Sequence, residues 1–147
     1  MRILLMGGTD ITQAVSERLG VPMEEAESIK QHTGMAERAP GVLADSPPPV
    51  KVIESSGAAF VEEVRGSLDY YLAQAGSVEV KRIVLSGGGG QLRGLAGRLS
   101  LATRLPVESG SAMSGLKIGK VDLDAAQLAL VSPVASVPVG LAMGVAS

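Results

Sequence analysis

Hydrophobic and polar residues along the 147-residue chain follow two periods, one typical of helices and one of short buried strands. Apolar side chains three and four positions apart predict helices from residue 9 or 10 to 19 and over 22–31, 53–75, 91–105 and 133–145. Short apolar runs predict buried strands at 2–6, 82–86 and 106–108. The resulting order, β-α-α-α-β-α-β-α, predicts an α/β chain with a mainly parallel sheet and helices on its faces.

Two segments show no such period. Residues 34–50 contain several prolines and residues 109–121 are rich in glycine and serine, so both are predicted to be loops, the second with a short extended piece at 116–118. Asp10 follows a predicted strand and two glycines, a position that superficially suggests a phosphate motif. Capping the next helix is the favoured role, since Asp commonly accepts backbone N–H groups at such junctions.

Composition narrows the functional classes. A hydrophobic content of 46% can form a sizeable core, and a net charge of −2 offers no electrostatic footprint for nucleic acid. The absence of cysteine excludes disulfides, cysteine nucleophiles and thiolate metal sites. The one histidine, His32, is expected at the surface, because a metal site needs more ligands than one.

Residues 125–147 contain no charged side chain and are long enough to cross a bilayer. Pro133 and Pro138 interrupt the segment, however, and its Ala, Ser and Gly residues are only weakly apolar. We therefore expect a helix buried within a soluble protein at 133–145.

The glycine run after the second strand is the main candidate site; it comprises Gly87, Gly88, Gly89 and Gly90. Backbone N–H groups at the start of a helix attract phosphate, although a tight turn without a ligand fits the residues equally well. The P-loop pattern fails because no Lys-Ser or Lys-Thr follows. The dinucleotide fingerprint fails at Leu92, but Glu108 stands where a ribose-binding acid would, so a Rossmann-type domain remains an alternative.

Two segments resemble the actin-like ATPase superfamily. RIVLSGGGGQLRGL is similar to its adenosine motif, and ILLMGGTDITQAVSERLG followed by MEEAESIK is similar to the part in which a helix carries a glutamate and a lysine over the ribose and base. Glu27 and Lys30 match that pair, so the resemblance implies that they contact a nucleotide together with the glycine run. Without the resemblance, a solvated ion pair is the simpler interpretation of these two residues.

Within the superfamily the chain most resembles the PilM family of type IV pilus assembly, and the FtsA family is second in resemblance. The segments that carry the resemblance to the PilM family are GSLDYYLAQ, IVLSGGGGQLRGLAGRL, LPVE and VPVGLAMG, whereas GSAMSGLKIGK departs from the pattern. The resemblance implies the C-terminal portion of such a protein, with a ribonuclease H-like fold. Residues 1–20 and 80–147 would form a large subdomain, and 21–79 an inserted helical subdomain containing the proline-rich loop at 34–50.

The family resemblance also implies a function. An intact relative would bind ATP with Mg²⁺ between two halves and act as a cytoplasmic scaffold at the inner-membrane pilus platform, where the cytoplasmic tail of PilN binds mainly to the other half. This chain lacks the phosphate and Mg²⁺ motifs, so we expect weak or no ATP binding, no catalytic residue, no metal site and no hydrolysis. Apolar surface at the cut face would favour self-association. An FtsA-like cell-division protein is a further alternative, although residues 125–147 lack the cationic face of a membrane-targeting helix.

Overall fold

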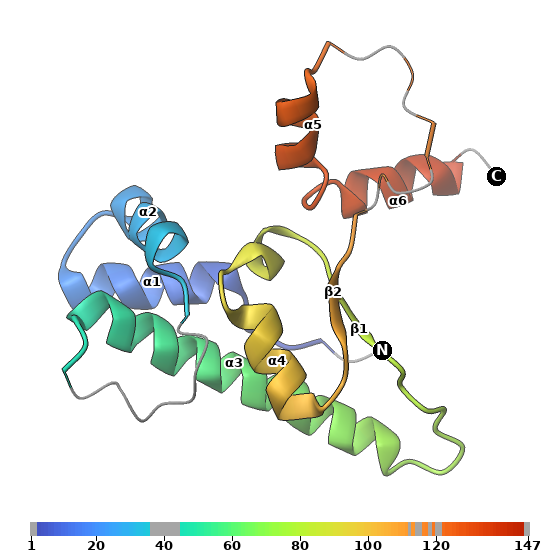
Figure 1. The fold of residues 1–147 in the computed structure, drawn as a ribbon, viewed down its shortest axis with the longest axis horizontal. Coiled ribbons are helices and arrows are strands. Elements are labelled where there is room, and N and C mark those ends of the chain that lie inside the picture. Colours follow the sequence, from blue (N-terminus) through green and yellow to red (C-terminus); the bar gives the residue numbers. More distant parts are fainter. Residues whose placement is uncertain are drawn as a thin grey trace.

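The computed structural model describes residues 3–35, 45–111, 113, 116–117, 119 and 122–145. Its elements, in chain order, are α1 (Gly8–Leu19), α2 (Met23–Thr33), α3 (Pro48–Leu72), β1 (Ile83–Leu85), the 3₁₀ turn η1 (Gly88–Gln91), α4 (Leu95–Thr103), β2 (Val107–Ser109), α5 (Ala125–Val131) and α6 (Ser136–Val145). The described chain is a helix-rich α/β structure (Figure 1).

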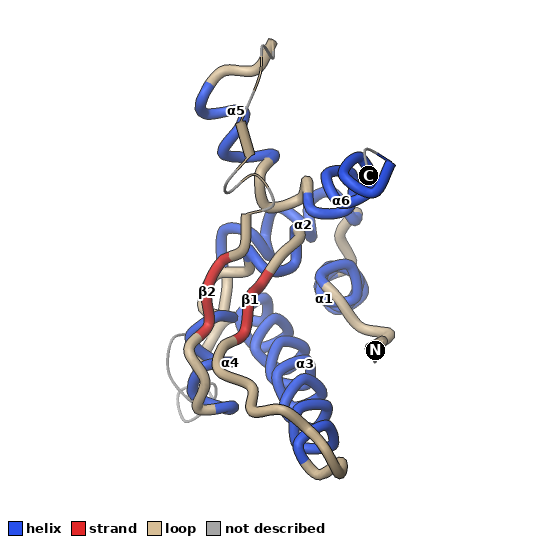
Figure 2. The backbone as a smooth tube through the Cα atoms, turned by 90° about the vertical axis from the view of Figure 1, so that its right-hand side faces the viewer, coloured by secondary structure: helices blue, strands red, loops and turns tan. Residues whose placement is uncertain are grey.

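The sheet consists of β1 and β2, which run parallel with Ile83 opposite Val107 and Leu85 opposite Ser109. The connection between them contains η1 and α4, so the four elements form a β-α-β unit. Figure 2 shows the two strands side by side. Because the strands are parallel, their carboxyl ends share one edge of the sheet, and this edge holds the site described below.

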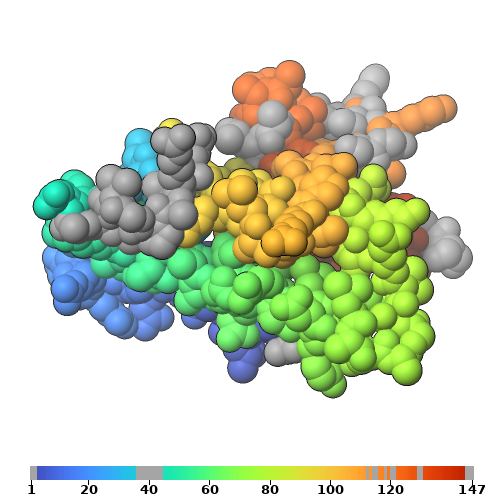
Figure 3. All heavy atoms as spheres, turned by 60° about the horizontal axis from the view of Figure 1, so that its bottom comes forward, coloured from blue at the N-terminus to red at the C-terminus, as the bar shows by residue number. Residues whose placement is uncertain are grey.

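Helix α3 is the central support of the molecule, because it packs against α1, α2 and α4. Figure 3 shows α3 and α4 lying against each other along one face. The helices enclose one core, in which Val15, Ile53 and Leu99 are fully buried and these further side chains are nearly so: Ile11, Ala26, Met35, Val61 and Leu95. The core therefore joins helices from the first half of the chain to the β-α-β unit.

The strand predicted at residues 2–6 is wrong for the described residues 3–6, which are irregular. Ile3 is 70% exposed and Leu5 is 96% exposed, so the apolar run is also not buried. A strand needs a hydrogen-bonded neighbour, and the sheet in the described residues contains only β1 and β2. Val84 in the middle of β1 is 52% exposed. Parallel strands are normally covered on both faces, but the described residues leave the Val84 side of β1 partly uncovered.

Several helix boundaries differ from the predicted ones, and three of the starts have a clear physical reason or consequence. Helix α3 begins at Pro48, inside the predicted loop, because the first turn of a helix has no acceptor for its N–H groups and tolerates proline. Helix α4 begins at Leu95 instead of residue 91. Helix α1 begins at Gly8, and Asp10 accepts a hydrogen bond from the Gly7 N–H at 2.6 Å, so its capping role is confirmed from a position inside the helix. Residues 36–44 of the first predicted loop and parts of 112–121 in the second lie outside the described residues. Leu116 and Lys117, from the predicted extended piece, are described and are not in a strand.

The C-terminal segment forms two helices and not the single buried helix that was expected. Helix α6 is largely exposed, with Val137 71% and Leu141 68% accessible. The turn between α5 and α6 is attached to the carboxyl ends of the strands: the Gly87 N–H donates to the Pro133 carbonyl at 2.8 Å, and Ser86 Oγ hydrogen-bonds Ser136 Oγ. Among the helices described, none is long and apolar enough to span a membrane.

Candidate functional site

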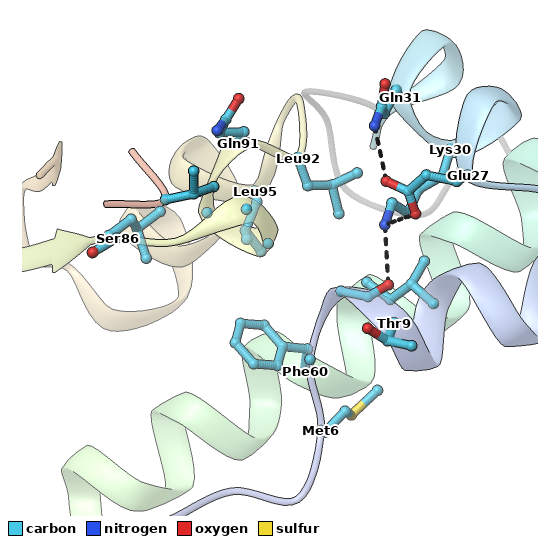
Figure 4. Close-up of a pocket in the computed structure, with 18 residues that line it drawn as sticks. Met6, Thr9, Glu27, Lys30, Gln31, Phe60, Ser86, Gln91, Leu92 and Leu95 are labelled. Atoms are coloured by element: carbon cyan, nitrogen blue, oxygen red, sulfur yellow. Dashed lines mark hydrogen bonds and ion pairs between the residues drawn. The ribbon is translucent and has the colours of Figure 1, made fainter. Parts of the chain in front are cut away.

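A cleft of about 1000 Å³ lies where the start of α1, α2, the middle of α3, the end of β1 and the glycine run converge (Figure 4). It brings together the sequence-predicted residues Glu27, Lys30, Gly88, Gly89 and Gly90. The chain therefore places two groups of candidate residues, about sixty positions apart in the sequence, on the walls of one cleft.

The glycine run differs from its predicted form in one respect. It passes into the 3₁₀ turn η1 and ends there, and α4 starts only after Gly94, whose φ is +81°. The predicted order of a strand at 82–86, a glycine turn and a helix is thus confirmed in outline, but the glycines do not form the first turn of α4. Gly87 has φ of +87° and is not among the lining residues, since its N–H is bonded to Pro133 on the side of α5 and α6.

The glycine run lies against a second glycine pair at the start of α1. A Cβ atom built on Gly8 would lie 3.3 Å from Gly89 Cα, and one built on Gly89 would lie 3.4 Å from the Gly8 nitrogen. A side chain on either residue would be tightly packed against the other backbone, which would have to shift by a few tenths of an ångström. The contact fixes the width of the cleft between α1 and η1.

Helix α2 contributes Glu27 and Lys30, three positions apart and therefore on one side of the helix. Lys30 Nζ lies 2.7 Å from Glu27 Oε2, 2.8 Å from Thr12 Oγ1 and 3.1 Å from the Gly8 carbonyl oxygen. The Lys30 side chain is 10% exposed and that of Glu27 is 41% exposed. The solvated ion pair considered from the sequence is therefore not what forms: both side chains line the cleft, but the Lys30 side chain is nearly buried and the Glu27 carboxylate is the more exposed of the two.

Three donors hold the Glu27 carboxylate. Lys30 and Thr12 donate to Oε2, at 2.7 and 2.5 Å, and Gln31 Nε2 donates to Oε1 at 2.9 Å. Burial by itself raises the pKa of Glu27, but the hydrogen bonds from Lys30, Thr12 and Gln31, with the Lys30 charge, outweigh burial and lower this pKa below 4.5. The carboxylate is thus ionised at neutral pH.

Thr12 belongs to this cluster, although the sequence pattern alone did not single it out. It is 3% exposed and lies on α1 between the carboxylate and the ammonium group. The sequence does contain a signal for a buried Thr12. Positions 12, 15 and 19 are spaced as one face of a helix, so Thr12 falls on the same face as the apolar residues Val15 and Leu19. A hydroxyl on an apolar face needs a buried hydrogen-bond partner.

One wall of the cleft is apolar. Phe60 from α3 and Leu92 and Leu95 beside the glycine run form it (Figure 4). Val134 from the α5–α6 turn also lines the cleft. The cleft therefore combines one anionic acceptor, a stretch of bare backbone and a hydrophobic surface. This combination suits a ligand with a flat apolar part and polar hydrogen-bond donors.

The other candidate residues lie elsewhere. Glu108 on β2 does not line the cleft, and its carboxylate lies 3.8 Å from Arg82 at the surface. His32 is exposed, and its Nδ1 lies 2.7 Å from the Ser28 carbonyl oxygen. Within the described ranges, no group of three or more His, Asp or Glu side chains is placed to hold a metal ion.

The parallel β-α-β unit with a cleft beside the carboxyl ends of its strands defines the class of α/β proteins in which this edge is the usual ligand-binding side. Comparison with known proteins gives the family. The family model described as type IV pilus assembly protein PilM matches residues 1–145, and the chain belongs to this family.

A solved structure described as a "PilM-PilN type IV pilus biogenesis complex" is similar to this chain, with a TM-score of 0.78 and 24% sequence identity. The similarity covers 97% of this chain and 38% of that one, so the chain spans well under half of its structural relative. The chain shares its fold with that part of the solved structure. No curated protein matches the chain.

Proposed function

We propose that this chain supplies the adenosine-facing part of a nucleotide site in an actin-like protein of type IV pilus assembly. The observation that carries the proposal is the convergence of Gly88–Gly90 with Glu27 and Lys30 on one cleft, beside the strand ends. Family membership supports the pilus role, and it does not favour the Rossmann-type or cell-division alternatives.

The residues present fit the adenosine end of ATP. The glycine run lets a ligand approach the backbone, the apolar wall of Leu92, Leu95 and Phe60 can cover a base, and Glu27 can accept a hydrogen bond from a ribose hydroxyl. Bound Mg-ATP would supply the transferable phosphoryl group. The role proposed for this part of the site is to bind and orient the nucleotide.

We further propose that residues 1–20 and 80–147 form a large subdomain of ribonuclease H-like fold and that 21–79 form the inserted helical subdomain. The longer protein would serve as a cytoplasmic scaffold on the inner-membrane platform. Its partners would include a PilN-like tail, since the similar solved structure is a PilM-PilN complex, and parts that this chain does not contain would make most of that contact. Self-association through exposed apolar surface stays a prediction; α6 supports it with Val137 and Leu141.

An NMR titration of the 147-residue chain with Mg-ATP tests the proposed site. We expect weak, saturable shifts at millimolar ATP, confined to Gly88–Gly90, Glu27 and their neighbours, and smaller shifts with 2′,3′-dideoxy-ATP, which lacks the ribose hydroxyls. Shifts located outside the cleft, or their complete absence, would contradict nucleotide binding. Sub-micromolar affinity or measurable hydrolysis would contradict the expectation that phosphate binding requires other parts of the longer protein.

NAD separates the proposal from the Rossmann alternative. Under a dinucleotide-binding function, NAD should raise the melting temperature and shift the signals of Glu108. Under the proposed function it should give no shift at Glu108, because that side chain lies outside the cleft.

A further inference from the structure

Lys30 is surrounded by three oxygen atoms of the protein itself. Its Nζ lies 2.7 Å from Glu27 Oε2, 2.8 Å from Thr12 Oγ1 and 3.1 Å from the Gly8 carbonyl oxygen. An ammonium group has three hydrogens, and three acceptors use all of them. Lys30 can therefore offer a hydrogen bond to a ligand only by breaking one that it already makes.

Thr12 completes the arrangement. Its hydroxyl oxygen accepts from Lys30, and its one hydrogen lies between Glu27 Oε2 at 2.5 Å and the Gly8 carbonyl at 3.1 Å, so the nearer, charged oxygen takes it. Thr12, Glu27 and Lys30 thus form a closed triangle of hydrogen bonds, with Thr12 3% and Lys30 8% exposed.

Glu27 is the exposed member of the triangle that can still accept a hydrogen bond. Oε2 accepts from Thr12 and Lys30, while Oε1 accepts from Gln31 alone. Each carboxylate oxygen has two lone pairs, so Oε1 can accept one more hydrogen bond. The Glu27 side chain is 41% exposed on the cleft side, so a ligand can reach it.

We infer that Thr12 and Lys30 are positioning residues, which hold Glu27 in place so that the Glu27 carboxylate, and not the Lys30 ammonium group, makes this pair's hydrogen bond to a ligand hydroxyl or N–H group. The identity of that ligand as a nucleotide rests on the proposed function, whereas the arrangement of the triangle does not. The Lys30 ammonium group then acts on the ligand through Glu27 and donates no hydrogen bond to it.

The first test uses the chain without ligand and compares Thr12→Val with Thr12→Ser. Valine has the shape of threonine without its hydroxyl, whereas serine keeps the hydroxyl. We expect the pKa of Glu27, followed by carboxylate ¹³C NMR, to rise towards 4.5 in Thr12→Val and to return to the wild-type value in Thr12→Ser. Lys30 is the side chain whose charge lowers this pKa in the wild type, and it is present in both variants. Equal Glu27 titrations in both variants would overturn the role of Thr12.

The second test reads the Lys30 ammonium signal directly in the unmodified chain, so it does not depend on how a variant folds. We expect the ammonium hydrogens to exchange slowly with solvent, unlike those of the exposed Lys81 and Lys117, and to stay protected at millimolar ATP while the Glu27 carboxylate carbon shifts. Fast exchange, or an ATP-induced shift larger at Lys30 than at Glu27, would overturn the inference. If ATP shifts no residue of the cleft, the nucleotide proposal fails, and the ligand-free measurements still decide the roles of Thr12 and Lys30.

Discussion

Gly8 and Gly89 lie so close that a Cβ atom on Gly8 would stand 3.3 Å from Gly89 Cα. This contact joins the start of α1 to the 3₁₀ turn of the glycine run, and Lys30 donates to the carbonyl of the same Gly8. One residue thus connects the glycine run to the triangle of Thr12, Glu27 and Lys30. The sequence pattern marks Gly7-Gly8 as the end of a strand, but the structure uses it as one wall of the cleft.

Substituting Gly8 by alanine should therefore destabilise the protein. The atom that the new Cβ meets belongs to the backbone and cannot rotate away, so we expect a loss of about 1–2 kcal/mol in the free energy of unfolding. Gly97→Ala is the matched control, because a Cβ there meets nothing within 4 Å and alanine favours the helix by about 0.5–1 kcal/mol. Urea unfolding of both variants gives the comparison, and equal changes of the same sign would contradict the close packing.

Gly94 combines a left-handed backbone with a close contact. Gly76 has the left-handed backbone without the contact, so comparing the two glycines separates the two effects. Gly94 and Gly76 share φ of +81°, but a Cβ on Gly94 would overlap the Met35 carbonyl, whereas one on Gly76 meets nothing within 4 Å. Gly76→Ala should cost about 1 kcal/mol from the left-handed backbone alone. Gly94→Ala should cost at least about 2 kcal/mol, since the overlap adds to this strain. Thermal unfolding measures both, and a smaller loss for Gly94→Ala would show that the backbone at Met35 moves aside freely.

The buried ion pair between α3 and α4 offers a prediction about stability. Arg98 Nη1 lies 3.3 Å from Glu54 Oε2, and the two side chains are 11% and 2% exposed. Arg98→Met should cost about 3 kcal/mol because it removes a cation next to a buried carboxylate. Arg65→Met, which breaks the exposed pair with Glu62, should cost less than about 1 kcal/mol.

The same pair allows a second comparison. Glu54→Leu combined with Arg98→Met should recover much of the loss, because no charge then remains buried there. Denaturant unfolding of the two single variants and the double variant gives the coupling between the residues. A double variant that is as unstable as Arg98→Met would contradict this interpretation.

The low pKa of Glu27 predicts how stability depends on pH. Its folded-state pKa lies below the ordinary value of 4.5, so the unfolded chain binds this proton more readily than the folded chain. The stabilisation by the ionised group is therefore complete above 4.5 and is lost as the pH falls through the folded-state pKa. The difference in unfolding free energy between wild type and Glu27→Gln should shrink over this acidic range. A difference that is constant with pH would contradict the assignment.

Local patterns in the sequence are sufficient for most helices and for β1 and β2. The period of apolar residues marks α1, α2 and α3, and glycines mark the ends of the first two. The run at residues 2–6 has the same local pattern as β1, yet it forms no strand over the described residues 3–6, because pairing depends on a neighbour that the local pattern does not contain. The start of α3 at Pro48 escapes prediction because proline is a loop signal as well as a first-turn residue.

The candidate site is predicted by family resemblance, and physical reasoning alone leaves it open. Resemblance brings Glu27, Lys30 and the glycine run together, and the structure places all of these on one cleft except Gly87. The role of Thr12 and the contact between Gly8 and Gly89 depend on how α1 packs against α2 and η1. Spacing along the sequence carries no information about such distances between elements.

The cleft also has a consequence for folding. Two of its walls come from the start of α1 and from the glycine run, and α2, the whole of α3 and β1 lie between these two segments in the chain. The β-α-β unit and each helix can form from near neighbours in the chain, but the contact of Gly8 with Gly89 requires a large loop to close, which is entropically costly. The assembly of the cleft therefore carries a loop-closure cost that the formation of a single helix does not.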